Sequence, residues 1–100
     1  MPVYVVERVV PGATLTSVEA MRRAAGEACR ASSDAGRPIR YVRSTFTPGD
    51  SRCRCLFEAA SAEDVRRLND AAQIPYQRIV VAVDFPGPTS IDTTTDEGDE

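Results

Sequence analysis

The pattern of apolar and polar positions begins with a strand and a helix. Residues 3–10 are β-branched and apolar apart from Glu7 and Arg8, and the run stops at Pro11-Gly12, which predicts a strand followed by a turn. A capping box from Thr16 to Glu19 then predicts the start of a helix. Gly36 provides the C-terminal cap of this helix. Apolar and small residues recur along it at helical spacing: Val18, Met21, Ala25, Ala28 and Cys29.

Two further apolar stretches predict a hairpin. The strands cover residues 39–46 and 53–58, and residues 47–51 between them are turn-forming. The sequence leaves two registers open: one places Ser44 opposite Cys55, and the other places Arg43 there. The choice matters because a slip of one residue moves every side chain of a strand to the other face of the sheet.

A second helix and a last strand complete the pattern. Ser61 predicts the N-cap of this helix, and Val65, Leu68 and Ala72 form its apolar stripe. Ile74-Pro75 predicts its end, since a residue before proline avoids the helical conformation. Residues 77–85 are almost continuously apolar and predict the last strand.

The resulting order is strand, helix, strand, strand, helix, strand. This order predicts an α+β fold of the ferredoxin-like type over residues 1–85, a four-stranded antiparallel sheet with both helices on one face. The first and last strands are apolar at both alternating sets of positions, so we expect the second face to be covered as well. A homodimer that packs sheet against sheet, as in dimeric α/β barrels, is the economical solution. The alternative is a monomer whose edge strand does not alternate regularly between apolar and polar residues.

Composition removes whole classes of function. A chain of 100 residues suffices for one domain, and it contains neither His nor Lys. A Ser-His-Asp triad, a Cys-His pair, a His-ligated metal site and Schiff-base lysine chemistry are therefore excluded within this chain.

The net charge of −3 is unevenly distributed. Residues 86–100 contain five acids and no base, which leaves residues 1–85 with twelve Arg against ten acids. The composition of residues 86–100 predicts a disordered acidic tail, either simply solvated or lying over arginines of the domain. No apolar run is long enough for a membrane span, and no signal peptide is evident. An odd number of cysteines fits a reducing cytoplasm.

The pair Cys53 and Cys55 is the most distinctive local feature. Residues i and i+2 of a strand point to the same face, at a spacing that is awkward for a disulfide. Three thiols do not complete a structural zinc site, so we expect these cysteines to be small buried hydrophobes. A redox role, or metal binding through Cys53 and Cys55, is the alternative.

Polar residues inside the apolar strands are the candidate ligand-binding groups. An Arg in such a position would clamp a carboxylate, and a Glu or Tyr would handle a proton. Cross-strand ion pairs between Arg and Glu are the simpler interpretation. The candidates are Glu7, Tyr41, Arg43, Cys55 and Glu58.

The sequence resembles the family called domain of unknown function 4242. The resemblance is carried by residues 5–8, by Arg40-Tyr41-Val42-Arg43-Ser44, by the strand of Cys55 and by residues 74–79. It implies a ferredoxin-like fold, dimers and, in some members, nickel binding. It also implies nickel ligands at the positions of Arg43, Cys55 and either Leu68 or Asn69, of which only Cys55 retains a ligating side chain. The resemblance therefore favours the fold and weakens the nickel function.

These observations predict a cytoplasmic binding or accessory protein with no metal, no cofactor and no catalytic residue. A cofactorless isomerase or monooxygenase-like enzyme, with a pocket in a dimeric barrel, is the alternative by analogy of fold. We expect a second copy of the chain and a small molecule as partners, and neither nucleic acid nor a membrane.

Overall fold

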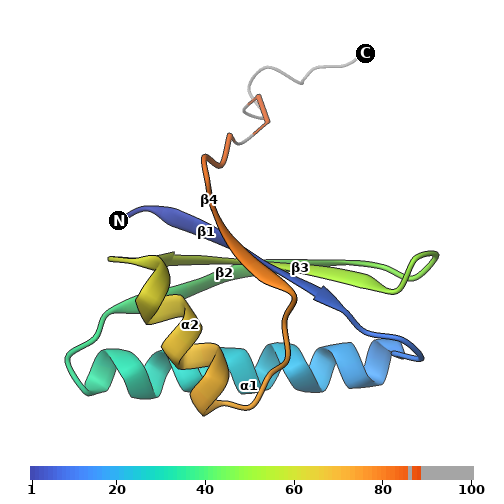
Figure 1. The fold of residues 1–100 in the computed structure, drawn as a ribbon, viewed down its shortest axis with the longest axis horizontal. Helices are drawn as coiled ribbons and strands as arrows, with labels where there is room; N and C mark the ends of the chain where they lie inside the picture. The colour runs from blue at the N-terminus through green and yellow to red at the C-terminus, as the bar shows by residue number, and fades with distance from the viewer. Residues whose placement is uncertain (86, 89–100) are drawn as a thin grey trace.

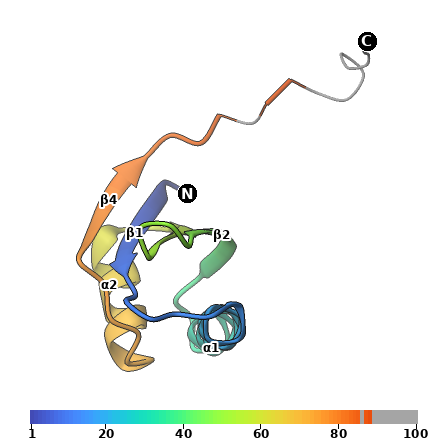
Figure 2. The same cartoon turned by 90° about the vertical axis from the view of Figure 1, so that its right-hand side faces the viewer.

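One antiparallel sheet carries both helices on the same face. The computed structural model describes residues 1–85, 87 and 88. The strands are β1 (Val3–Val9), β2 (Ile39–Thr47), β3 (Arg52–Ala59) and β4 (Arg78–Ala82), in the spatial order β2-β3-β1-β4. Helices α1 (Leu15–Asp34) and α2 (Ala62–Ala71) form the second layer, below the sheet in Figure 1 and in the end-on view of Figure 2. The predicted ferredoxin-like fold is confirmed.

Helix α1 begins earlier than the sequence predicted. Its N-cap is Thr14, whose Oγ1 accepts a hydrogen bond from the backbone N–H of Ser17 at 3.1 Å, while Ser17 Oγ accepts one from the Thr14 N–H at 2.9 Å. The predicted box from Thr16 to Glu19 is therefore wrong. A serine closes the box in place of a glutamate, and Glu19 instead accepts hydrogen bonds from Arg22 and Arg23 on the helix surface.

The C-terminal ends of both helices have the same geometry. After α1, the N–H of Gly36 bonds to the Ser33 carbonyl and the N–H of Arg37 to the Ser32 carbonyl, which is a Schellman motif with Gly36 at a φ of 89°. The cap at Gly36 is thus confirmed. Helix α2 begins at its predicted cap, Ser61, and ends before the predicted Ile74-Pro75, through an equivalent motif with Gln73 at a φ of 58°.

The hairpin of β2 and β3 contains both registers that the sequence left open. Tyr41 pairs with Phe57, whereas beyond an irregularity at Val42 Arg43 pairs with Leu56 and Ser44 with Cys55. The extra residue is a β-bulge, which shifts the register by one position and reverses which residues face the helices. Tyr41 and Ser44 therefore both lie on the helix side, although they are three residues apart.

The core lies between the sheet and the helices. It is formed mainly by alternating residues of β1 and β3 with the stripe of α2, including Val6, Phe57, Val65 and Leu68. Strand β4 is shorter than predicted, because pairing with β1 ends at Ala82 opposite Val3. The predicted disordered tail over residues 86–100 lies outside the described residues apart from Gly87 and Pro88. Neither described helix combines the length and apolarity that crossing a membrane requires.

Candidate functional site

A buried arginine is at the centre of the polar groups on the helix side. In β1, Tyr4, Val6 and Arg8 point alternately toward the helices, and the Arg8 side chain ends in the core with 2% of its surface exposed. Its Nε donates to Cys55 Sγ at 3.4 Å, and Nη2 donates to Asn69 Oδ1 at 2.7 Å. Nη1 donates to the carbonyls of Ile74 at 3.4 Å and Pro75 at 2.9 Å. Arg8 thus joins β1 to β3, α2 and the loop before β4.

The guanidinium of Arg8 has no carboxylate partner among the described residues. Its hydrogen-bond acceptors are one thiol, one side-chain amide and two backbone carbonyls. Asn69 is itself fully buried and is held in place by a bond from its Nδ2 to the Val65 carbonyl at 2.8 Å. Buried charges in proteins are normally paired, so this uncompensated cation is the most unusual electrostatic feature of the described residues.

Cys55 connects Arg8 to a second set of polar groups. Its Sγ accepts a hydrogen bond from Ser44 Oγ at 3.0 Å, and the Sγ of Cys53 lies 3.9 Å away. Ser44 also bonds to the Tyr41 hydroxyl, and the Tyr41 ring packs against Phe57 with centroids 5.3 Å apart. The bulge at Val42 makes this network possible, because it turns Ser44 rather than Arg43 toward Cys55. We call Arg8, Ser44, Cys53, Cys55 and Asn69 the sulfur cluster.

Burial affects the ionisation of these groups. It raises the pKa of the Cys53 thiol to about 11, and the neighbouring Cys55 adds to the shift. Burial also raises the pKa of the Tyr41 hydroxyl, and its hydrogen bond with Ser44 opposes this shift. A tyrosine in this state stays protonated near neutral pH and serves as a hydrogen-bonding group rather than a base.

The opposite face of the sheet, which we call the open face, has an apolar centre and a charged rim. Val3 and Val5 of β1, Leu56 of β3 and Val80 of β4 share this face. Three ion pairs surround them: Arg78 with Glu7 at 2.9 Å, Arg40 with Glu58 at 2.9 Å and Arg43 with Asp84 at 2.8 Å.

The structure divides the predicted ligand-binding residues between the two faces. Tyr41 and Cys55 belong to the helix side, whereas Glu7, Arg43 and Glu58 lie on the open face. Hydrogen bonds from Arg78 and Arg40 lower the pKa of the Glu7 and Glu58 carboxyls, respectively. Glu7, Arg43 and Glu58 thus share one face of the sheet, and Tyr41 and Cys55 share the other.

Sequence reasoning missed the central residue of the sulfur cluster. Arg8 is a polar residue within an apolar strand, yet neither it nor Ser44 is among the predicted site residues, and Asn69 enters only as one of two positions that the family resemblance implies. The available signal was the shared alternation of Arg8 with Tyr4 and Val6, which places all three on one face of β1.

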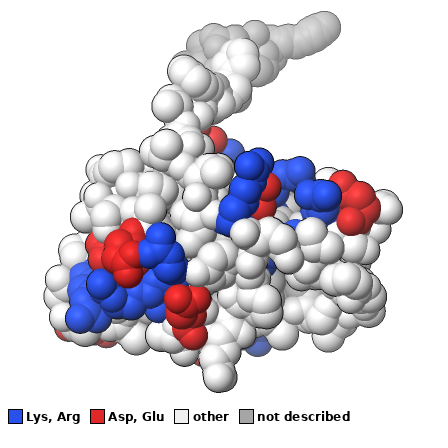
Figure 3. Space-filling view, in the orientation of Figure 1, with Lys and Arg blue, Asp and Glu red and all other residues white. Residues whose placement is uncertain are grey.

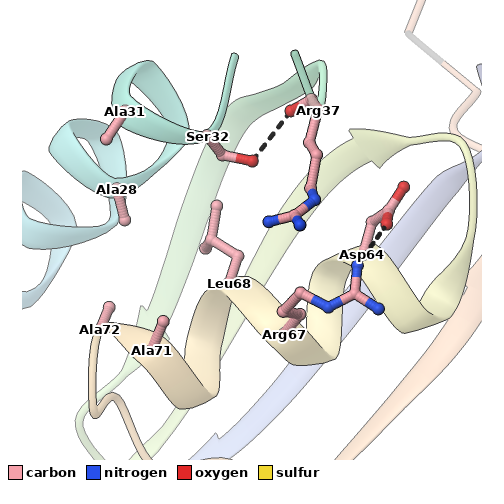
Figure 4. A pocket seen from close by; sticks show the side chains of 9 residues that line it. All are labelled: Ala28, Ala31, Ser32, Arg37, Asp64, Arg67, Leu68, Ala71 and Ala72. Atoms are coloured by element: carbon pink, nitrogen blue, oxygen red, sulfur yellow. Dashed lines mark hydrogen bonds and ion pairs between the residues drawn. The ribbon is translucent and has the colours of Figure 1, made fainter. Parts of the chain in front are cut away.

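The described surface also has shallow hollows outside the sulfur cluster. One of about 300 Å³ lies between the helices, with Ala28 and Leu68 on its walls and Arg37 turned toward it (Figure 4). A larger apolar one of about 710 Å³ lies between the first turns of α1 and the loop after α2, and Val10, Met21 and Ile74 are among its lining residues. Charges of both signs are interleaved over α2 and toward the β2–β3 turn (Figure 3), which gives no basic patch for nucleic acid on this side.

The described residues offer a poor donor set for nickel. They contain no group of three or more His, Cys, Asp or Glu side chains placed to hold a metal ion. Of the positions at which the family resemblance implies ligands, Arg43 lies on the open face, while Cys55 and Asn69 both bind the Arg8 guanidinium. A cation of the protein itself thus lies between the two positions that share a face.

Comparison with known proteins gives a family and a fold. Residues 4–81 match the family described as "Nickel responsive protein SCO4226-like". The crystal structure of SCO4226 from Streptomyces coelicolor A3(2) superposes with a TM-score of 0.63 at 18% sequence identity, over 78% of this chain and 91% of that chain. At this identity the structural similarity supports the fold. No curated protein matches the chain.

Proposed function

The chain belongs to the SCO4226-like family of nickel-responsive proteins, and we propose that it is a binding protein of this family that does not itself hold nickel. We take this family and domain of unknown function 4242, which the sequence resembles, to be one group. No observation in the described residues favours the enzymatic alternative.

The contacts of Arg8 are the observation that supports the proposal. Nickel sites in proteins are built from several imidazole, thiolate or carboxylate ligands. Here the chain has no imidazole, and the sulfur of Cys55 and the amide of Asn69 are both hydrogen-bonded to a buried guanidinium. A divalent cation at this place would meet the positive charge of Arg8 at close range.

Nickel titration of the untagged protein tests the proposal. We expect isothermal titration calorimetry with Ni²⁺ to show no saturable binding, and elemental analysis of the purified protein to show no stoichiometric nickel. The double variant Arg8→Ala/Asn69→His is the matched comparison, because it removes the cation and restores one imidazole beside Cys55. One nickel bound per wild-type chain would overturn the proposal.

We further propose that the protein is a homodimer joined through the open face. The apolar centre of this face is surrounded by ion pairs. An apolar centre with a polar rim is the usual arrangement in protein–protein interfaces. Beyond the end of β4, Val83 and Phe85 are 75% and 83% exposed, which leaves further apolar surface near this edge of the sheet. Light scattering coupled to size exclusion tests this, with an expected mass of twice 10.8 kDa. A mass of one chain would contradict it.

The cytoplasm is the compartment that we propose for this protein. Its three cysteines are an odd number, all three are buried, and two of them have a strand spacing that is awkward for a disulfide. Such a set of thiols fits a reducing environment. Localisation of a fluorescent fusion, with fractionation of cells as a second measurement, tests this assignment.

A further inference from the structure

The sulfur cluster holds two thiols at a distance that suits a shared ion. Cys53 and Cys55 point to the same side of β3, are 0% and 1% exposed, and have their Sγ atoms 3.9 Å apart. Two metal–thiolate bonds of about 2.3 Å each span roughly 3.8 Å at a tetrahedral angle and about 4.6 Å when linear. The observed 3.9 Å is the separation of a bent S–metal–S arrangement, so a linear one requires the two Sγ atoms to move apart by about 0.7 Å through small rotations of the side chains.

The charge of Arg8 limits which ion fits. A divalent ion on two thiolates gives a neutral unit, which leaves the buried guanidinium uncompensated. A monovalent ion on two thiolates gives a unit of charge −1, which neutralises Arg8. Arg8 Nε already lies 3.4 Å from Cys55 Sγ, and Ser44 Oγ donates to the same sulfur at 3.0 Å. Both donors stabilise negative charge on that sulfur.

We propose that Cys53 and Cys55 form a two-coordinate site for a monovalent thiophilic cation, Cu(I), with Arg8 as the counter-charge. Soft thiolate ligands select Cu(I) over harder ions. Binding forms two Cu–S bonds, and each thiol that is protonated beforehand releases its proton to solvent. Copper stays in the +1 state throughout, so the step requires neither oxidant nor reductant.

The other uses of the two thiols fit less well. Zinc and nickel need further ligands, and the described residues place no third His, Cys, Asp or Glu in such a group. A disulfide between residues i and i+2 of a strand is strained, and it would remove the sulfur acceptor of Arg8 without providing a negative charge. Among these possibilities, Cu(I) is the one whose two-thiolate unit supplies the negative charge that Arg8 lacks.

Anaerobic titration of the reduced protein with Cu(I), in competition with the chromogenic chelator bicinchoninate, tests the proposal. We expect one Cu(I) per chain for the wild type. Cys53→Ser and Cys55→Ser should lose this binding, whereas Cys29→Ser, the matched control on α1, should retain it. Absence of Cu(I) uptake by the wild type, or wild-type uptake by Cys53→Ser, would overturn the proposal.

The counter-charge is tested separately. Arg8→Met should weaken Cu(I) binding by about 10–100-fold, the usual effect of losing a group that supports a metal ligand. Arg8→Lys keeps the charge and should bind more tightly than Arg8→Met, and circular dichroism establishes that each variant is folded. Equal affinity of Arg8→Met and wild type would overturn the role of Arg8. If Arg8→Met does not fold, Arg8→Lys provides the test. Its affinity for Cu(I) should then be lower than that of the wild type and higher than that of Cys55→Ser.

This inference does not depend on the proposed function. Ni²⁺ titrated in parallel separates the two: nickel binding would contradict the proposed function and leave the Cu(I) site standing, whereas failure of Cu(I) to bind would leave the proposed function unaffected.

Discussion

At the scale of single residues, the structure depends on a buried cation that is solvated by the protein itself. Arg8 is almost fully removed from water, yet its guanidinium donates to four acceptors on three other segments of the chain. These bonds replace water around the charge and reduce the cost of burying it. Arg8 is therefore a cross-link of the core.

Arg8 and Asn69 should be energetically coupled. Their bond of 2.7 Å is charge-assisted and fully buried, so either single substitution leaves a buried polar group without its partner. We expect Arg8→Met and Asn69→Ala each to lower the free energy of unfolding by about 1–3 kcal/mol. The double variant should lose less than the sum, with a coupling of about 1 kcal/mol or more in a double-mutant cycle measured by urea unfolding. Additive losses would show that the contact contributes nothing of its own.

Cys29 should make stability fall at alkaline pH. Burial raises the pKa of its thiol from an ordinary 9.0 to about 11, so between these values the unfolded chain loses a proton that the folded chain keeps. The contribution of this thiol to the free energy of unfolding is fully present below about pH 9. It decreases as the pH rises toward 11, by about 2–3 kcal/mol at most. Urea unfolding under reductant, from about pH 7 to about pH 10.5, measures this. Cys29→Ala should show a shallower decrease than wild type, and parallel curves would contradict the assignment.

At the scale of helices and strands, the sequence predicted every element, but it misplaced the start of α1 and left the register of one hairpin open. The order of elements and the cap at Ser61 followed from local patterns. The start of α1 did not, because Thr14 and Thr16 are both suitable caps and the choice between them depends on the reciprocal bonds with Ser17. The bulge at Val42 was not predictable either, since the two registers differ by a single residue.

The same reasoning explains how much of the candidate site was predictable. Tyr41 and Cys55 could be selected because they interrupt or lie within apolar strands, and the structure places both in the network around Ser44. The burial of Arg8 in the core was not predictable, because a charged side chain is normally assigned to the solvated face. Only the packing of α2 and its loop against β1 supplies the carbonyl and amide acceptors that Arg8 requires.

The end of α2 offers a stabilising substitution. Gln73 has a φ of 58° in its Schellman motif, a conformation in which glycine avoids the steric cost of a Cβ atom. We expect Gln73→Gly to raise the free energy of unfolding by about 0.5–1 kcal/mol. Gly36→Gln, at the equivalent position after α1, is the converse control and should destabilise by a similar amount. Thermal melts of the two variants measure the effect, and a change of the same sign in both would contradict it.

At the scale of the whole molecule, the two faces of the sheet differ in what covers them. The helix side is closed by α1 and α2 and contains the sulfur cluster, whereas the open face has no covering element among the described residues (Figure 2). Val3, Val5, Leu56 and Val80 on that face would be solvated in a monomer, at a cost proportional to their apolar area. A second copy of the chain removes this area from water and leaves the ion pairs at the rim.

The dimer should therefore depend on apolar character at the centre of the open face. In a sheet-to-sheet dimer, Leu56→Glu would place a carboxylate without a partner near its symmetry mate, and a buried unpaired charge is strongly unfavourable. We expect this variant to raise the dissociation constant of the dimer by at least about a hundredfold, measured by analytical ultracentrifugation. Leu15→Glu is the matched control, because Leu15 lies at the start of α1 and is already 77% exposed. If both variants remain dimers, the interface lies elsewhere, and if Leu15→Glu alone dissociates, it lies on the helix side.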